Sequence, residues 1–304
     1  MKAVPSYPKI YTLGSVDTGD IFTGDVHVQE KLDGSQFSFG WNEDGKLVMR
    51  SHHQALSFDN PTGMFDKAIQ HCQMIVESIV SYSPDTYFYC EYMRTPKQNT
   101  LAYGRIPQNH LMLFDATDTQ GWFSREQLAT AAGMLGIELV PELYRGSADL
   151  ALLKELLKTE SFLGGPTIEG VVVKNYGVMH DHYGQVSPLM CKYVNEKFQE
   201  TNKKDFHERT TKGTIEQYVM SFKSEARWQK AIQHLREQGQ LLGAPQDIGP
   251  LIKEIERDVR EEEEANIKDV LYKLTIGDIV RVARVGFAEF YKAMLADRVR
   301  KMVE

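Results

Sequence analysis

Alternation of hydrophobic and polar residues dominates the first two thirds of the chain. Such alternation, or a short apolar run between turn signals, is typical of β-strands. The turn signals include Asn42-Glu43-Asp44-Gly45. The pattern predicts strands over residues 26–30, 35–41, 46–51, 86–92, 110–116, 168–174 and 189–194.

Helical spacing of apolar residues predicts three helices among these strands. One covers residues 64–80, and another covers 149–158. The third begins at Ser124, where Gln127 three residues later completes a capping box.

The pattern of hydrophobic and polar residues changes near residue 195. Beyond it we find no convincing strand, and amphipathic patterns predict helices over 214–238, 250–273 and 276–303. Gly243-Ala244-Pro245 and Gly249-Pro250 break the pattern, and Thr275 with Asp278 predicts a cap for the last helix. The pattern predicts two domains, 1–195 and 196–304.

Composition narrows the class of protein. The chain has 304 residues, 42% of them hydrophobic, without an apolar run of membrane-spanning length and without a signal-peptide core at its start. Cys72, Cys90 and Cys191 are odd in number and form no CxxC pair, so we expect neither disulfides nor structural zinc. These features predict a cytoplasmic protein that does not contact membranes.

Charge is unevenly distributed along the chain. The net charge is −7, with 15 Lys or Arg against 22 Asp or Glu in residues 1–195 and 20 of each in residues 196–304. This argues against non-specific coating of nucleic acid and allows a local basic groove.

The stretch EKLDGS places Lys31, Asp33 and Gly34 at the end of a predicted strand. One interpretation is an exposed hairpin turn, because Asp-Gly is a common turn sequence. The other is a nucleophilic lysine at the mouth of a nucleotide pocket.

Charged residues at other strand ends favour the second interpretation. A lysine attacks phosphorus only when deprotonated, and nearby cations or a metal ion lower its pKa. Carboxylates would hold the metal, and Phe114 would stack on a base. The residues in question are Arg50, Glu91, Asp115, Glu169, Lys174 and Lys192.

Six short motifs occur in a characteristic order: EKLDGS, RS, CEY, FD, EGVVVK and CKYV. Over residues 28–194 this series resembles the covalent nucleotidyltransferases, which include polynucleotide ligases and capping enzymes. The stretch between the third and fourth motifs and the helical tail are most similar to phage-type RNA ligases of the RNA ligase 2 type. DNA ligases and capping enzymes carry an OB-fold after the last motif, and we find no such strands here.

The resemblance implies an α+β fold, with an antiparallel-sheet nucleotidyltransferase domain followed by a small all-helical domain. It implies an ATP-dependent enzyme that uses Mg²⁺, or Mn²⁺ in its place, and that joins the 5′-phosphate and 3′-hydroxyl ends of RNA. The enzyme would act in the cytoplasm, which is the cytoplasm of the host if a phage encodes the protein. Lys31 would take AMP from ATP. Glu30 and Phe114 would frame the adenine, Glu91 would contact the ribose, Arg50, Lys174 and Lys192 would contact phosphates, and Asp33, Glu91 and Glu169 would position the metal.

One position departs from the family pattern. The last motif often has two lysines that flank one residue, and the first is Met190 here. Lys192 would then act alone or with help from Lys197. Glu169 and Lys174 would serve one pocket only if Glu169 precedes the regular strand at Gly170, which we expect.

Two other readings stay open. One is a different covalent nucleotidyltransferase, such as a DNA ligase or a GTP-dependent capping enzyme. The other is a non-catalytic RNA-binding module. The natural substrate, which would be a nicked duplex, a cleaved tRNA or two single strands, is not specified by the sequence.

Overall fold

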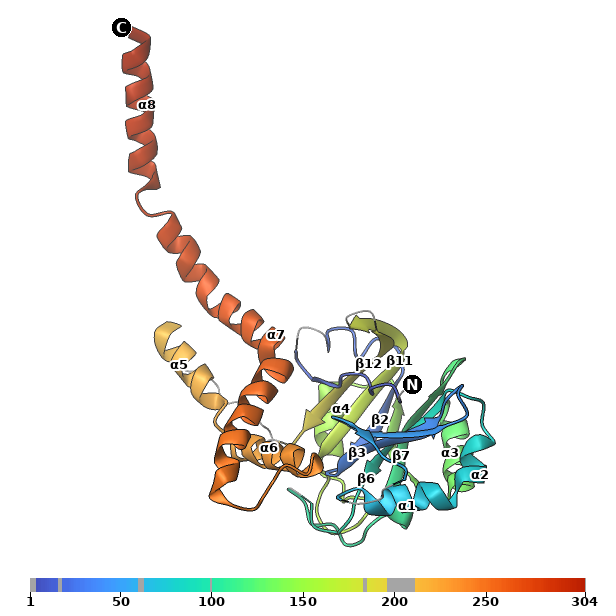
Figure 1. The fold of residues 1–304 in the computed structure, drawn as a ribbon. Helices are drawn as coiled ribbons and strands as arrows, with labels where there is room; N and C mark the ends of the chain where they lie inside the picture. The colour runs from blue at the N-terminus through green and yellow to red at the C-terminus, as the bar shows by residue number, and fades with distance from the viewer. Residues whose placement is uncertain are drawn as a thin grey trace.

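The computed structural model describes residues 4–15, 18–59, 63–98, 100–182, 185–195 and 211–303. It has the expected α+β class: two largely antiparallel sheets, with helices on their outer faces, are followed by a purely helical region (Figure 1). Residues 196–210 lie outside the described part of the chain, so the domain boundary at 195 stays a prediction.

The first sheet has five strands in the order β1-β12-β11-β2-β10. Val26 and Val28 of β2 are fully buried in its core, while Gln29 and Lys31 face the opposite side. The expected strands 168–174 and 189–194 correspond to the start of β11, which begins at Gly170, and the end of β12 in a longer hairpin; β10 is an additional strand. The bounds are β1 (Tyr11–Thr12), β2 (Val26–Lys31), β10 (Glu142–Gly146), β11 (Gly170–His182) and β12 (Gln185–Val194).

The second sheet has seven strands, in the order β5-β4-β3-β6-β7-β8 with β9 paired to β7. Phe37 and Phe39 of β3 and Phe88 of β6 are fully buried in its outer core. The bounds are β3 (Ser35–Trp41), β4 (Leu47–Ser51), β5 (Ala55–Leu56), β6 (Thr86–Tyr92), β7 (Leu111–Asp118), β8 (Gly121–Trp122) and β9 (Glu138–Leu139).

Four helices cover the outer faces of the sheets. Helices α1 (Asp66–Met74), α2 (Val76–Val80) and α3 (Arg125–Leu135) pack on the seven-stranded sheet, and α4 (Leu150–Leu156) packs on the other. The capping box of α3 is confirmed: the Ser124 hydroxyl accepts a hydrogen bond from the Gln127 N–H, and the Gln127 side chain accepts one from the Ser124 N–H. The inner faces of the two sheets are thereby left to form a cleft.

Residues 211–303 are helical, as expected, but the helix boundaries differ. The expected helix 214–238 is two helices, α5 (Thr211–Ser221) and α6 (Glu225–Glu237), because Ser224 caps a new helix. The break expected at Thr275 was wrong. Its hydroxyl donates to the Leu271 carbonyl within α7 (Ile248–Ala283), and α8 (Phe287–Val303) follows Gly286, whose φ is 80°.

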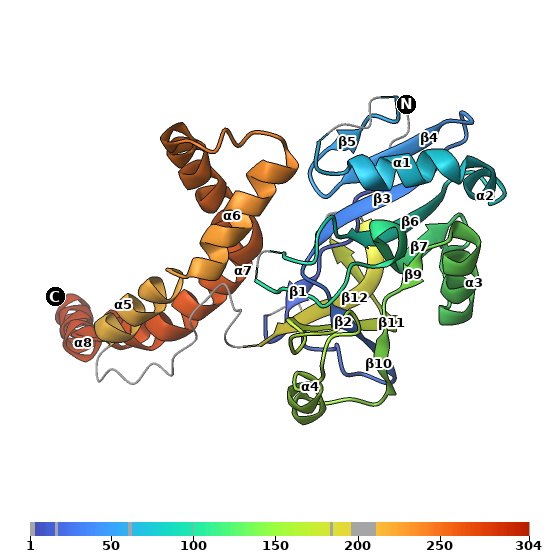
Figure 2. The ribbon, with the colours of Figure 1, turned by 90° about the horizontal axis from the view of Figure 1, so that it is seen from below.

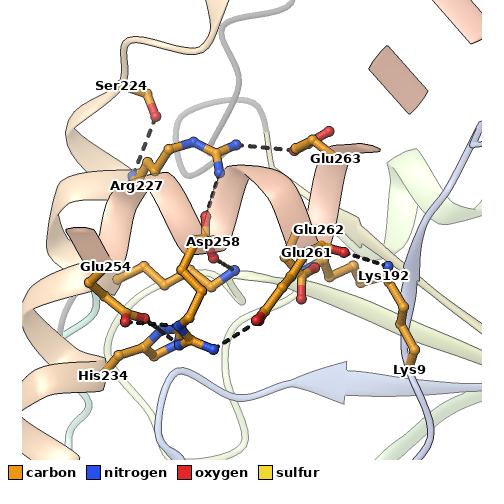
Figure 3. Close-up of polar contacts among 12 residues, drawn as sticks. Lys9, Lys192, Ser224, Arg227, His234, Glu254, Asp258, Glu261, Glu262 and Glu263 are labelled. Carbon is orange, nitrogen blue, oxygen red and sulfur yellow. Dashed lines mark hydrogen bonds and ion pairs between the residues drawn. The ribbon is translucent and has the colours of Figure 1, made fainter. Parts of the chain in front are cut away.

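The helical region contacts the sheets through α6 and the middle of α7, while α8 extends away from the body (Figures 1 and 2). Gln233 of α6 donates to the Gly34 carbonyl at 2.6 Å. Buried Arg227 forms ion pairs with Asp258 and Glu263, which tie α6 to α7 (Figure 3). None of the helices that the structure describes has the length and hydropathy needed to span a membrane.

Three histidine rings form part of this contact. The ring centroids of His52 and His53 are 4.6 Å apart, and those of His53 and His234 are 4.4 Å apart. Burial and the other histidines hold the pKa of His53 at about 3 and that of His52 at about 4. Burial also lowers the pKa of His234, although its partner Glu254 acts in the opposite direction.

Acidification should therefore weaken the docking of α6. The folded pKa values lie below the ordinary value of 6.5, so the stabilisation is complete above pH 6.5 and decreases as the pH falls below it. We expect Tm to fall by a few degrees between about pH 7.5 and 5. The fall should be smaller in the His53→Gln variant. Thermal melts by circular dichroism test this, and identical pH profiles of the two proteins would contradict it.

Candidate active site

The chain crosses from one sheet to the other at residues 32–34. Strand β2 pairs with β10 and β11, whereas β3 pairs with β4 and β6, so Asp33-Gly34 is not the turn of a hairpin. A Cβ on Gly34 would lie 2.8 Å from both the Glu91 Cγ and the Tyr92 carbonyl oxygen. Glycine is needed here because β6 passes so closely, and the hairpin interpretation is excluded.

The crossover borders a cleft of about 270 Å³ between the sheets and the helical region. Lys31, Glu91 and Glu169 line it from three different strands or strand ends, and Lys192 lines it from β12. A second, smaller pocket of about 150 Å³ shares Lys31, Glu91 and Lys192 and continues toward Phe114. Asp33 lines the larger cleft as well, so five of the expected site residues meet there.

Lys31 forms an ion pair with Glu169, with 2.6 Å between Nζ and Oε2. Burial alone would lower the pKa of Lys31, but the carboxylates of Glu169, Asp33 and Glu91 outweigh burial and raise it. Among the protein's own groups, carboxylates rather than cations therefore set the direction of this pKa shift.

Glu169 lies just before β11, as expected. Val171 and Val173 are buried in the core, while Val172 and Lys174 line the opposite face together with Lys31. Glu169 reaches this side because it precedes the regular strand. The strand starts at Gly170, where a Cβ would lie 2.6 Å from the Tyr193 carbonyl oxygen.

The Glu91 carboxylate has no hydrogen-bond partner within the described part of the chain. Its pKa is raised to about 8, first by burial and then by the nearby carboxylates Glu237 and Glu169, against the effect of Lys31. Glu237 has its own pKa raised to about 7 by burial. The cleft therefore concentrates carboxylates that would be stabilised by a cation.

Asp33 lines the same cleft, but one of its carboxylate oxygens supports a loop. Its Oδ2 accepts hydrogen bonds from the Thr100 N–H and hydroxyl and from the Leu101 N–H, at 2.7 to 2.8 Å. Three donors occupy this oxygen, so the carboxylate holds the loop at residues 100–101. The expected role of Asp33 at the metal stays a prediction.

The smaller pocket has an aromatic wall. The Phe114 ring lies 5.0 Å from the Tyr7 ring, edge to face, and Gln29 and Val172 line the same space. A flat apolar pocket next to a charged cleft suits a nucleobase joined to phosphates.

Lys174 lies at the base of this pocket and is almost fully buried. Its Nζ donates to Asp115 Oδ2 and to the Phe114 carbonyl oxygen, both at 2.8 Å. Asp115 also accepts from the Tyr7 and Tyr176 hydroxyls. This pairing uses the charge of Lys174 within the protein, and the expected contact of Lys174 with phosphates stays a prediction.

Two further expected residues make contacts of their own within the protein. Glu30 lines the smaller pocket, and its carboxylate accepts from the Ser161 hydroxyl at 2.6 Å and from the Phe162 N–H at 3.1 Å. The Arg50 guanidinium donates to the Val4 carbonyl and, at 2.6 Å, to the Ser6 hydroxyl. Arg50 lines neither the cleft nor the smaller pocket, so the structure does not bring it together with Lys31.

Lys192 retains its expected place. Its Nζ lies 3.7 Å from Glu262 Oε2, a loose ion pair at the cleft edge. Met190 is fully buried beside Lys174 and accepts a hydrogen bond from Tyr7 at its sulfur. Lys197 lies outside the described residues.

Several residues of the cleft and of the smaller pocket could not be predicted from the sequence pattern. Tyr7 and Lys9 come from an N-terminal segment with no strand period, and Glu262 belongs to an acidic run that resembled a solvated helix face. Gln29 could have been predicted, because it lies two residues before Lys31 in β2 and therefore points to the same face of the sheet.

Similar proteins provide an independent comparison. Residues 24–194 match the family model for RNA ligase, and no curated protein matches the chain significantly. A Naegleria gruberi RNA ligase mutant solved with ATP and Mn is 13% identical, with a TM-score of 0.48 over 65% of this chain and 58% of that one. A putative ATP-dependent DNA ligase from Aquifex aeolicus is 16% identical, with a TM-score of 0.43 over 86% of this chain and 66% of that one.

An archaeal ATP-dependent RNA ligase is 15% identical, with a TM-score of 0.43 over 83% of this chain and 66% of that one. The chain thus spans less than two thirds of the length of these solved ligases. The match to the family model is stronger evidence than these structural similarities, because it covers more than half of this chain and includes all six motifs. The chain belongs to the RNA ligase family.

Proposed function

We propose that this protein is an ATP-dependent RNA ligase that joins a 5′-phosphate end to a 3′-hydroxyl end. The observation that carries the proposal is the position of Lys31. Its amine lies at the junction of a carboxylate-rich cleft and an aromatic pocket, 2.6 Å from Glu169. Membership of the RNA ligase family supports the same reaction.

The proposed chemistry has three steps. The unprotonated Lys31 amine attacks the α-phosphorus of ATP, so that a P–N bond forms and pyrophosphate leaves. An oxygen of the RNA 5′-phosphate then attacks the same phosphorus, and the P–N bond breaks to return the lysine. Finally the 3′-hydroxyl attacks the adenylated 5′-phosphate, and AMP leaves as the phosphodiester forms.

The two pockets suit the two ends of ATP. The adenine would stack on Phe114 beside Val172, in the smaller pocket. Glu91 lies between this pocket and the cleft, where the ribose hydroxyls would reach its unpartnered carboxylate. Lys192, at the edge of both pockets, would contact the phosphates.

Two carboxylates fit a divalent metal ion. Mg²⁺ is usually held by one or two carboxylates together with substrate phosphates and water, and Glu91 and Glu169 supply that number. Burial raises the pKa of each, so a bound cation would stabilise their charged forms. Mg²⁺, or Mn²⁺ in its place, would neutralise the phosphates. Glu169 holds the Lys31 amine at the junction of the two pockets.

The cellular compartment follows from the cysteines. Cys72, Cys90 and Cys191 are all buried and unpaired, which suits a reducing compartment, and we place the protein in the cytoplasm.

Self-labelling with radioactive nucleotide tests this proposal. The full chain should become labelled by [α-³²P]ATP with Mg²⁺ and not by the corresponding GTP, which separates a ligase from a capping enzyme. The labelled protein should then seal 5′-phosphate and 3′-hydroxyl ends of RNA. Nicked duplex, a cleaved stem-loop and two single strands, each as RNA and as DNA, identify the substrate. Labelling by GTP, or sealing of DNA alone, would overturn the proposal.

A further inference from the structure

The cleft offers fewer lysines for phosphate binding than the motif series implies. Met190 stands where the family pattern often has a lysine, and it is buried against Tyr7. Lys174 is committed to Asp115. Lys192 is then the one motif lysine, apart from the nucleophile, at the edge of the described cleft.

The N-terminal segment brings another lysine to this edge. Strand β1 pairs in parallel with β12, with Thr12 opposite Lys192, and the Leu13 N–H donates to the Lys192 carbonyl at 2.9 Å. Lys9, three residues before Thr12, lines the same cleft as Lys31 and Lys192. In Figure 3, Lys9 and Lys192 both lie beside the stretch of α7 that carries Glu261 and Glu262.

Lys9 is held there without loss of its charge. Its Nζ donates to the Glu261 carbonyl oxygen at 2.9 Å and lies 5.5 Å from the centroid of the Tyr11 ring. Within the described part of the chain, it forms no ion pair with a carboxylate. A carbonyl oxygen and an aromatic face orient an ammonium group but do not neutralise it, so the positive charge stays available to an anion.

We propose that Lys9 is a phosphate-binding residue, which supplies beside Lys192 the second cation for the pyrophosphate portion of ATP. This inference rests on the proposed function. To bind phosphate, Lys9 leaves the Glu261 carbonyl and Lys192 leaves Glu262. Phosphate binding therefore competes with two contacts that join α7 to the body of the protein.

Pyrophosphate with Mg²⁺ is the probe, because it occupies the phosphate end alone. Isothermal titration calorimetry on the full chain should show binding weakened about 10-fold in Lys9→Ala and in Lys192→Ala, and largely retained in Lys9→Arg. Lys46→Ala, which removes an exposed lysine outside the cleft, should bind as the wild type does. Circular dichroism melts confirm that each variant is folded.

A kinetic measurement distinguishes failure of the role of Lys9 from failure of the proposed ligase function. The KM for ATP in self-adenylation should rise about 10-fold in Lys9→Ala, and Lys9→Arg should restore most of it. Pyrophosphate binding and KM unchanged in Lys9→Ala, in a wild-type protein that adenylates itself, would overturn the role of Lys9 alone. Failure of the wild type to form any adduct would overturn the proposed function instead.

Discussion

Replacement of Lys31 by Ala should abolish the covalent adduct with AMP, with a rate loss of more than about 1,000-fold. The side chain is the only amine at the junction of the two pockets that also contacts Glu169 in the described structure. The fold should survive, because Lys31 is half-buried and lies at the end of β2. Denaturing gel electrophoresis after incubation with labelled ATP and Mg²⁺ measures the adduct.

Lys31→Arg is the matched control for this prediction. Arginine keeps a positive charge opposite Glu169, so the ion pair and the stability should be largely retained. A guanidinium does not lose its proton in proteins and cannot act as the nucleophile. Both variants should therefore lack the label. Label on either chain at wild-type levels would contradict the role of Lys31.

Replacement of Lys174 by Met should destabilise the protein by about 3–5 kcal/mol, which corresponds to roughly 10 °C in Tm. The Lys174–Asp115 pair is almost fully buried on both sides, so the substitution leaves an uncompensated carboxylate in the interior. The hydroxyls of Tyr7 and Tyr176 still donate to Asp115, but they carry no charge.

The double variant Lys174→Met with Asp115→Leu isolates this effect. Removal of both charges takes away the unpaired carboxylate, so much of the lost stability should return. Urea unfolding of the four proteins in the cycle gives the coupling energy. A stable Lys174→Met variant with a strongly raised KM for ATP would show that Lys174 contacts phosphates instead, as the resemblance to the family implies.

The order of motifs was enough to predict which strands meet at the site. Lys31, Glu91 and Lys192 lie in clear strand patterns, and alternation along each strand decides which face of its own sheet each residue occupies. All three line the smaller pocket. The position of Glu169 just before the regular strand was predicted correctly, because Gly170 marks the start of that strand.

The partners of the other charged residues could not be predicted in this way. The Asp33 carboxylate is occupied by Thr100 and Leu101, and that of Glu30 by Ser161, contacts that join segments 67 to 131 residues apart. No local pattern reports such contacts. The direction of the pKa shift of Lys31 could not be predicted for the same reason, since it depends on which distant side chains face the cleft.

Very short strands and the breaks between helices could not be predicted from the hydrophobic pattern either. Strand β1 has two residues, too few to show a period, and its pairing with β12 is what brings Lys9 to the cleft. Thr275 resembled a helix cap, yet a threonine hydroxyl can also bond to a carbonyl one turn earlier inside a helix, as it does here.

The mass of the wild-type protein after incubation with ATP and Mg²⁺ tests the central claim most directly. Mass spectrometry of the intact chain, followed by peptide mapping, should show one added adenylyl group, and it should lie on Lys31. The group should disappear when pyrophosphate is supplied, because the first step is reversible. An unmodified chain, or an adenylyl group on another residue such as Lys9 or Lys192, would contradict the assignment of Lys31 as the nucleophile.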